Sequence, residues 1–126
     1  MNLSVPGASM TGLKRTGFST LELVPLLTMT KNEFSSMFQG TPIERAKWAG
    51  LKRNACVALG NMRDREAVPA LVKTLQEDEP LVRGHAAWAL GRIKGEEGLL
   101  HLARALEQEA DPYVREEIEL AIGDQE

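Results

Sequence analysis

The sequence predicts an all-helical α-solenoid, a stack of antiparallel helix pairs with a period of about 31 residues. The main observation is an internal repeat, because KRNACVALGN (52–61), RGHAAWALGR (83–92) and REEIELAIGD (115–124) align with offsets of 31 and 32. The intervening segments EAVPALVKTL (66–75) and EGLLHLARAL (97–106) also align, with an offset of 31. A single helix pair of this length cannot bury its apolar face alone, so stacking of pairs must create the core.

Helical phase distinguishes a true repeat from shared composition. At about 100° per residue, five positions of each aligned helix fall on one face, and fourteen of these fifteen positions are apolar. In the middle helix they are Val82, Ala86, Ala89, Leu90 and Ile93. The composition agrees, because 43% of the residues are hydrophobic and only 5% are aromatic. Small and branched side chains on helices would therefore form the core.

Capping signals place the elements along the chain. Residues 1–20 are rich in Gly, Ser and Thr without periodicity, which indicates a flexible leader or linker and leaves 21–126 as one repeat domain. The segments 30–33 and 41–44 are capping boxes, and the second opens a helix expected to run to a stop signal at Gly60-Asn61. The other expected helix starts are Asp64, Asp78 and Asp111, and the other expected stops are Gly95 and Gly123.

The residue inventory is poor in catalytic and metal-binding groups. The one cysteine, Cys56, excludes an internal disulfide and a four-cysteine metal site, and a lone thiol is typical of a reducing cytoplasm. The two histidines, His85 and His101, belong to different expected helices. No run approaches the roughly 18 apolar residues that span a bilayer. We therefore expect a cytoplasmic protein without a membrane segment, a catalytic residue or a metal site in this chain.

Charge is distributed unevenly. Residues 1–65 carry a net charge of +5 and residues 66–126 carry −8, so an anionic partner should meet the first half. The segment 41–65 has a local charge of +4, and Arg45, Trp48 and Lys52 share one helical stripe in it. Such a stripe suits RNA, because cations neutralise phosphates and an indole stacks on an unpaired base. A solvated helix face with a packed Trp48 is the alternative. The candidate RNA-binding residues are Arg45, Lys47, Trp48, Lys52, Arg53 and Arg63.

Two further sets of residues recur along the repeats. His85, Trp88 and Arg92 form a second stripe, which is either a binding surface or a packing face, and for Trp88 we favour packing. The cations Lys52, Arg83 and Arg115 occupy equivalent positions in the three aligned helices. Their recurrence favours a structural ladder over RNA contact. The expected acidic partners are turn residues such as Asp78 and Asp111.

The stretch 40–61 resembles the C-terminal part of epoxyqueuosine reductases, which complete queuosine synthesis on a tRNA wobble nucleotide. The similarity extends with less specific residues over about 21–123, and it implies HEAT-like repeats. The family pattern is Gly-Ser/Thr-x-Ile-x-Arg, then Leu-x-Arg-Asn and Val-Ala-Leu-Gly-Asn. The matching residues are Gly40, Thr41, Ile43, Arg45, Leu51, Arg53, Asn54, Val57, Ala58, Leu59, Gly60 and Asn61.

The resemblance implies a role beside catalytic domains that this chain does not contain. Family members carry a cobalamin-binding domain and a ferredoxin-like domain with two 4Fe-4S clusters, upstream of the helical repeats. None of the corresponding residues is present here, so we expect no cofactor and no activity from this chain alone. The implied partners are tRNA and the catalytic domain of the reductase.

Two other functions are compatible with helical repeats. One is a HEAT-like protein–protein scaffold whose basic end docks an unknown acidic partner. The other, a helical-repeat lyase acting on bilins, shares only the generic repeats with this sequence.

Overall fold

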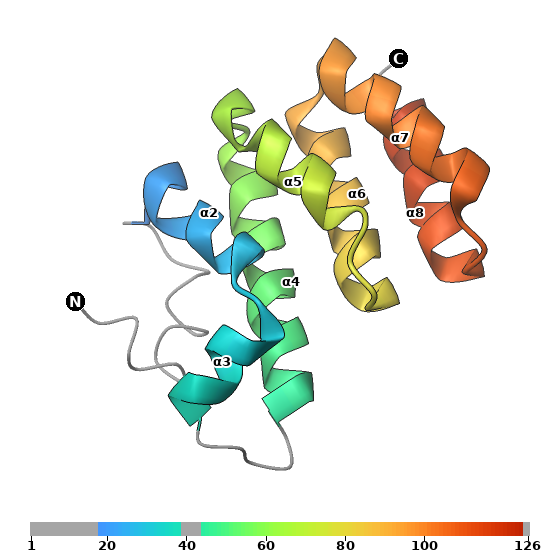
Figure 1. The fold of residues 1–126 in the computed structure, drawn as a ribbon. Coiled ribbons are helices and arrows are strands. Elements are labelled where there is room, and N and C mark those ends of the chain that lie inside the picture. The colour runs from blue at the N-terminus through green and yellow to red at the C-terminus, as the bar shows by residue number, and fades with distance from the viewer. Residues whose placement is uncertain (1–17, 39–43, 125–126) are drawn as a thin grey trace.

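The computed structural model of the chain describes residues 18–38 and 44–124 (Figure 1). Within these ranges all regular elements are helical and there is no strand, which confirms the all-helical prediction. The leader up to residue 17 and most of the predicted capping box 41–44 lie outside the described ranges. The elements are α2 (Thr20–Thr28), α3 (Lys31–Phe38), α4 (Glu44–Met62), the 3-10 turn η2 (Arg65–Ala67), α5 (Val68–Thr74), α6 (Pro80–Ile93), α7 (Glu96–Gln108) and α8 (Pro112–Gly123).

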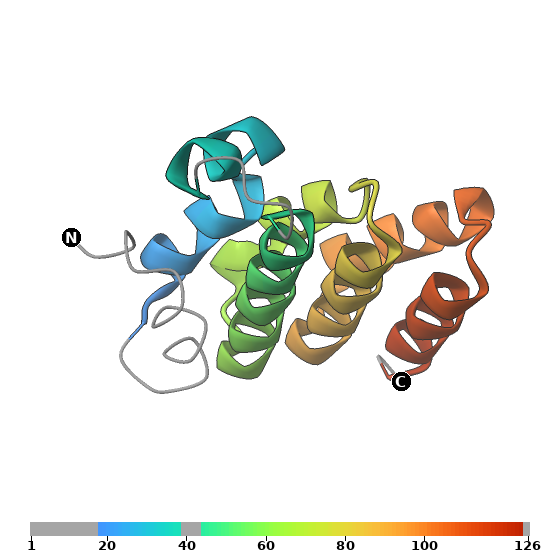
Figure 2. The same cartoon turned by 90° about the horizontal axis from the view of Figure 1, so that it is seen from below.

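The helices form two layers (Figure 2). The first layer contains α4, α6 and α8 side by side, and the second contains α2, α5 and α7. Helix α2 packs on α4 as α5 packs on α6 and α7 on α8. The three pairs are therefore stacked in one direction, which confirms the predicted solenoid. None of the helices in the described ranges is long and apolar enough to cross a membrane.

The core lies between the two layers and along the contacts within the first. The five apolar-face positions predicted for α6 are all buried. Close approach of the first-layer helices depends on glycine. A Cβ atom at Gly60 of α4 would lie 2.7 Å from Cζ3 of Trp88 and 3.0 Å from Cα of Ala89. At Gly91 of α6 it would lie 2.8 Å from Cβ of Ala121 in α8. A side chain at either position would push the helices apart.

Several helix starts follow the sequence signals. The Thr30 hydroxyl accepts from the Glu33 amide at 3.0 Å, and Glu33 accepts from the Thr30 amide at 2.8 Å, so the predicted capping box is present. The carboxylate of Asp64 accepts from the amide of Glu66 at 3.0 Å in η2. That of Asp111 accepts from the amide of Tyr113 at 2.9 Å, at the start of α8.

Two predicted boundaries are wrong. Helix α6 is capped by Glu79 rather than Asp78, without a side-chain cap bond, because Pro80 already occupies the first turn. Helix α4 continues one residue past the expected stop at Gly60-Asn61, to Met62, and ends where Arg63 takes a φ of 56°. Gly60 is needed for contact with α6 and not for a stop.

The start of α2 is tied to the repeats. Ser19 forms a capping box with Glu22, although residue 19 falls in the predicted leader. Thr20 is buried and its hydroxyl donates to the Asp64 carboxylate at 2.7 Å. The helical stack therefore includes these two residues.

Candidate functional site

Trp48 and Lys52 lie inside the protein. Their exposed fractions are 6% and 2%, and the Trp48 Nε1 donates to the carbonyl of Met29 at 3.2 Å. The Lys52 ammonium lies 4.6 Å from the centroid of the Trp48 ring and pairs with Glu77 at 2.5 Å. The prediction that these two side chains contact RNA is therefore wrong, because α2 and α3 pack on α4 and the turn after α5 supplies Glu77 to Lys52. The alternative of a packed Trp48 is correct.

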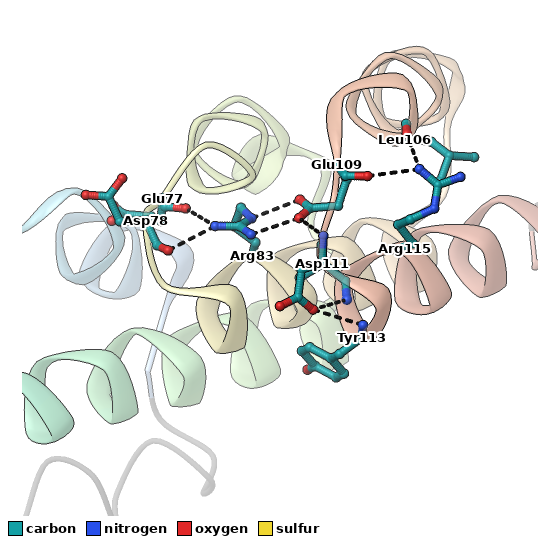
Figure 3. A network of polar contacts seen from close by, with 9 residues as sticks. Glu77, Asp78, Arg83, Leu106, Glu109, Asp111, Tyr113 and Arg115 are labelled. Carbon is teal, nitrogen blue, oxygen red and sulfur yellow. Dashed lines mark hydrogen bonds and ion pairs between the residues drawn. The ribbon is translucent and has the colours of Figure 1, made fainter.

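Lys52 is the first step of the predicted ladder (Figure 3 shows the others). Arg83 binds Glu109 with two hydrogen bonds, Nε to Oε1 at 2.9 Å and Nη2 to Oε2 at 2.8 Å. Its Nη1 donates to the carbonyls of Glu77 and Asp78 in the preceding turn. Arg115 donates from Nη1 to two carbonyls at the end of α7. Each cation thus binds residues in a turn between paired helices, either the α5–α6 turn or the α7–α8 turn.

The acidic partners of the ladder differ from the predicted ones. Glu77 and Glu109 supply the carboxylates, whereas Asp78 supplies a carbonyl and Asp111 caps α8. The bidentate contact with Arg83 lowers the pKa of Glu109. The ladder joins neighbouring repeats, because the cation of one helix pair binds the turn glutamate of the next.

The remaining basic candidates do not form one cluster. Lys47 and Arg63 are both exposed, but they lie at opposite ends of α4, about 24 Å apart along its axis at 1.5 Å per residue. Arg53 is half-buried in the middle of α4, with Nε 3.4 Å from the amide oxygen of Asn54. The side chain of Arg45 lies outside the described part of the structure. The local charge of +4 is therefore spread around the helix.

A more coherent site lies on the side of the first layer that faces away from α5 and α7. We call this surface the open face and define it by Arg53, Val57, Gly84, His85, Trp88, Arg92, Tyr113 and Glu117. It contains a hollow of about 180 Å³ that α4, α6 and α8 line together. The predicted second stripe of His85, Trp88 and Arg92 belongs to it.

Gly84 lets Tyr113 lie across α6. A Cβ atom at Gly84 would come within 2.4 Å of the Tyr113 ring. The Tyr113 hydroxyl lies 3.2 Å from Nδ1 of His85, and the same nitrogen lies 2.9 Å from the carbonyl of Leu81. A carbonyl oxygen only accepts, so we assign a proton to Nδ1 of His85. The Tyr113 ring of α8 is thus held against His85 and Gly84 of α6.

Trp88 packs against a neighbouring helix and also reaches the open face. Its ring is half-buried and packs against Gly60, as predicted, but it also lines the hollow. The Arg92 guanidinium lies 5.6 Å from the Trp88 ring centroid. The Nε of Arg92 is buried and has no hydrogen-bond partner among the described residues.

The charge of the open face changes from positive to negative along the stack. It is basic at Arg53 and Arg92, and α8 brings Glu117 and its exposed neighbour Glu116. Burial raises the pKa of the Tyr113 phenol, the carboxylates of Glu117 and Asp111 raise it further, and the Arg53 guanidinium opposes them. The hollow therefore has both cations and carboxylates around it, and they shift the pKa of Tyr113 in opposite directions.

Tyr113 and Glu117 of the open face are not among the residues predicted from sequence. The repeat itself contained the signal, because the offset of 32 places Glu117 at the position equivalent to His85 and Tyr113 at that equivalent to Leu81. Equivalent positions of a solenoid point to the same side of the stack.

The side chains within residues 18–38 and 44–124 do not fit an iron–sulfur cluster or a metal ion. No group of three His, Cys, Asp or Glu side chains within the described ranges could hold a metal. Cys56, the one cysteine of the sequence, is fully buried, and burial raises its pKa to about 12. It is a small core residue, as expected, and not an activated thiol.

Comparison with known protein families agrees with the architecture. A family profile described as HEAT repeats matches residues 46–123, more than half of the chain. The chain belongs to the HEAT-repeat family. The matched range contains the helix pairs α5/α6 and α7/α8. It also contains most of α4, the first-layer helix of the preceding pair α2/α4.

Relatives of this HEAT-repeat chain include epoxyqueuosine reductases. It is 43% identical over 101 residues to an uncharacterised protein of Geobacillus stearothermophilus, covering 77% of this chain and 45% of the relative. It is 38% identical over 104 residues to the epoxyqueuosine reductase of Bacillus subtilis, covering 79% of this chain and 26% of the enzyme. The chain thus spans less than half the length of these relatives.

A solved structure extends the likeness to three dimensions. The crystal structure of an epoxyqueuosine reductase with an epoxyqueuosine-modified tRNA-Tyr stem loop matches with a TM-score of 0.72 at 34% identity. The match covers 82% of this chain and 28% of the enzyme. The resemblance to epoxyqueuosine reductases noted from residues 40–61 is therefore confirmed over most of the HEAT-repeat fold.

Proposed function

We propose that this HEAT-repeat chain helps an epoxyqueuosine reductase to bind its tRNA, and that the chemistry belongs to a catalytic domain outside these residues. The observation that carries the proposal is the match in fold and sequence to a reductase crystallised with a tRNA stem loop. HEAT repeats alone would equally support a protein scaffold, which remains the second candidate.

The open face is the RNA-binding surface in this proposal. It combines the half-buried Arg53 and Arg92 with the indole of Trp88, which takes the role that Trp48 cannot fill. Cations that neutralise phosphates supply affinity, and aromatic rings stack on unpaired bases. Lys47 and Arg63 are exposed and add attraction from the two ends of α4. The acidic α8 repels phosphates, so RNA approaches from the side of α4.

Titration with an anticodon stem-loop at about 50 and 200 mM salt tests the proposal. Arg53→Gln and Arg92→Gln should each weaken binding and reduce the salt slope by about one unit if each cation contacts a phosphate. The matched control is Arg104→Gln, since Arg104 is exposed on α7 in the other layer. It removes the same charge and should leave the slope close to that of the parent.

A second control distinguishes the buried cation from the surface ones. Lys52→Ala should destabilise the fold by about 3–5 kcal/mol, because it leaves Glu77 without its partner. At a temperature where the variant stays folded, its salt slope should equal the parent's. Stem-loop affinity that is absent, or equally reduced by Arg53→Gln and Arg104→Gln, would favour the scaffold instead.

The chain alone should not reduce epoxyqueuosine in tRNA. Supplying cobalamin and a reductant should produce no turnover, because the chain has neither the cysteines for clusters nor an activated thiol. Turnover by the purified chain would contradict the assignment of the chemistry to another domain. Complementation by a separately expressed reductase catalytic domain would support it.

A further inference from the structure

The hollow of the open face has the form of a site for one flat ring. Its volume of about 180 Å³ is well below the roughly 300–1,000 Å³ of pockets for drug-sized ligands. Two aromatic side chains, Trp88 and Tyr113, line it, and Gly84 forms a part of the wall without a side chain. Glu117 contributes a carboxylate to the same lining. The site is assembled from three helices and is held by the contacts of Gly60, Gly84 and His85 described above.

We propose that this hollow binds a single unpaired RNA base, and that Glu117 makes it selective for guanine. The inference rests on the proposed RNA-binding function and adds a subsite with a base preference to it. Proteins recognise single-stranded RNA by stacking splayed bases on aromatic rings and by hydrogen bonds to their Watson–Crick edges. The aromatic pair supplies the stacking, and the carboxylate supplies the hydrogen bonds.

The preference for guanine follows from donor geometry. Guanine presents two adjacent donors, N1–H and the N2 amino group, on its Watson–Crick edge, and an ionised carboxylate offers two acceptors and no donor. Uracil presents one N–H between two carbonyl oxygens, which a carboxylate repels. Adenine and cytosine each offer an amino group beside a ring nitrogen acceptor, so only one of their two groups can bind.

An aromatic hollow with a carboxylate also resembles a site for a cationic side chain of a protein partner. The charges around it argue against that occupant. Arg92 already lies on the Trp88 ring, and Arg53 lies close enough to oppose the raised pKa of Tyr113. These two cations would repel a lysine or arginine, whereas they attract the phosphates that flank a base.

The test compares two short single-stranded RNAs that differ by one central base, guanine or uracil, in an otherwise all-uracil sequence. Binding to the full chain is measured by fluorescence anisotropy, and Trp88→Phe checks whether stacking contributes. The parent should prefer the guanine RNA by about tenfold, the scale of one good bidentate contact. Glu117→Gln should abolish this preference, because the amide replaces one acceptor oxygen by a donor.

Glu119→Gln is the matched control. It removes the same charge from the same helix, and Glu119 is exposed and does not line the hollow. Glu119→Gln should bind both RNAs slightly more tightly and keep the preference, whereas Glu117→Gln should bind the guanine RNA more weakly than the parent and lose the preference. Thermal melting confirms that both remain folded.

Each other outcome overturns the inference. A parent without preference, or a preference that survives in Glu117→Gln, would exclude guanine recognition at this hollow, while stem-loop binding would still uphold the proposed function. Loss of the guanine preference in both variants would mean that the net charge of α8, and not a contact with Glu117, causes the preference. An arginine-containing peptide that binds the parent but not Glu117→Gln, with neither the short RNAs nor the stem-loop bound, would show a protein partner and overturn both proposals.

Discussion

At the scale of single residues, charge in this protein has two distinct roles. Lys52, Arg83 and Arg115 are used for structure, since each binds a turn of the stack at close range. Arg53 and Arg92 lie on the open face, where no carboxylate bonds to them among the described contacts. A residue's type therefore does not reveal its role, but its recurrence at equivalent repeat positions does.

The bond between Arg83 and Glu109 should make the fold sensitive to acid. The pKa of Glu109 is lowered chiefly by its hydrogen bonds from Arg83, so the carboxylate stabilises the fold above the ordinary carboxyl pKa of 4.5. That contribution is lost as the pH falls through the lowered value. Glu109→Gln should therefore cost about 1–3 kcal/mol at pH 7. The deficit relative to the parent should shrink toward pH 3 in urea unfolding curves.

The control for this prediction is Glu107→Gln, at an exposed position of α7. It should change the free energy of unfolding by less than about 0.5 kcal/mol at either pH. An equal loss in both variants would mean that overall charge, and not the bond to Arg83, sets the acid sensitivity.

At the scale of helices, glycine controls how closely α6 and α8 pack. Gly91→Ala places a Cβ atom 2.9 Å from the Cα of Ala121, so backbone must move, and we expect a loss of about 1–3 kcal/mol. Gly98→Ala in α7 meets only the Leu90 side chain at an ordinary 3.5 Å. It should gain about 0.4–1 kcal/mol, because alanine restricts the unfolded chain. Thermal denaturation should thus show shifts of opposite sign, and a common sign would refute the packing argument.

At the scale of the whole molecule, a solenoid distributes its stability along the stack. Leu90, 1% exposed, lies in α6, which packs against α4, α5, α7 and α8. Ile122 is half-buried in α8, which packs on α6 and α7. Leu90→Ala should cost about 2–5 kcal/mol, and Ile122→Ala about 1 kcal/mol because less surface is buried. Equal losses in chemical denaturation would contradict a middle-to-end gradient of stability.

The repeat and its helical phase determined most of this architecture from sequence. The apolar face of α6, the capping box of Thr30 and Glu33 and the cap at Asp111 are all where the pattern places them. These features depend on local hydrogen bonds and on a periodicity that one helix displays by itself. The ladder was also predictable in kind, because equivalent cations recur, although its partners are glutamates one or two residues before the expected aspartates.

The site depended on tertiary structure. Helical phase places Trp48 and Lys52 on a stripe, but only the packing of α2 and α3 on α4, together with Glu77 in the turn after α5, decides that this stripe is buried. The open face brings Val57, Trp88 and Tyr113 together from three helices through approaches that Gly60 and Gly84 permit. A single sequence records which side each residue takes on its own helix. Which sides meet is decided by the way neighbouring helices pack, since burial and hollows are properties of several helices at once.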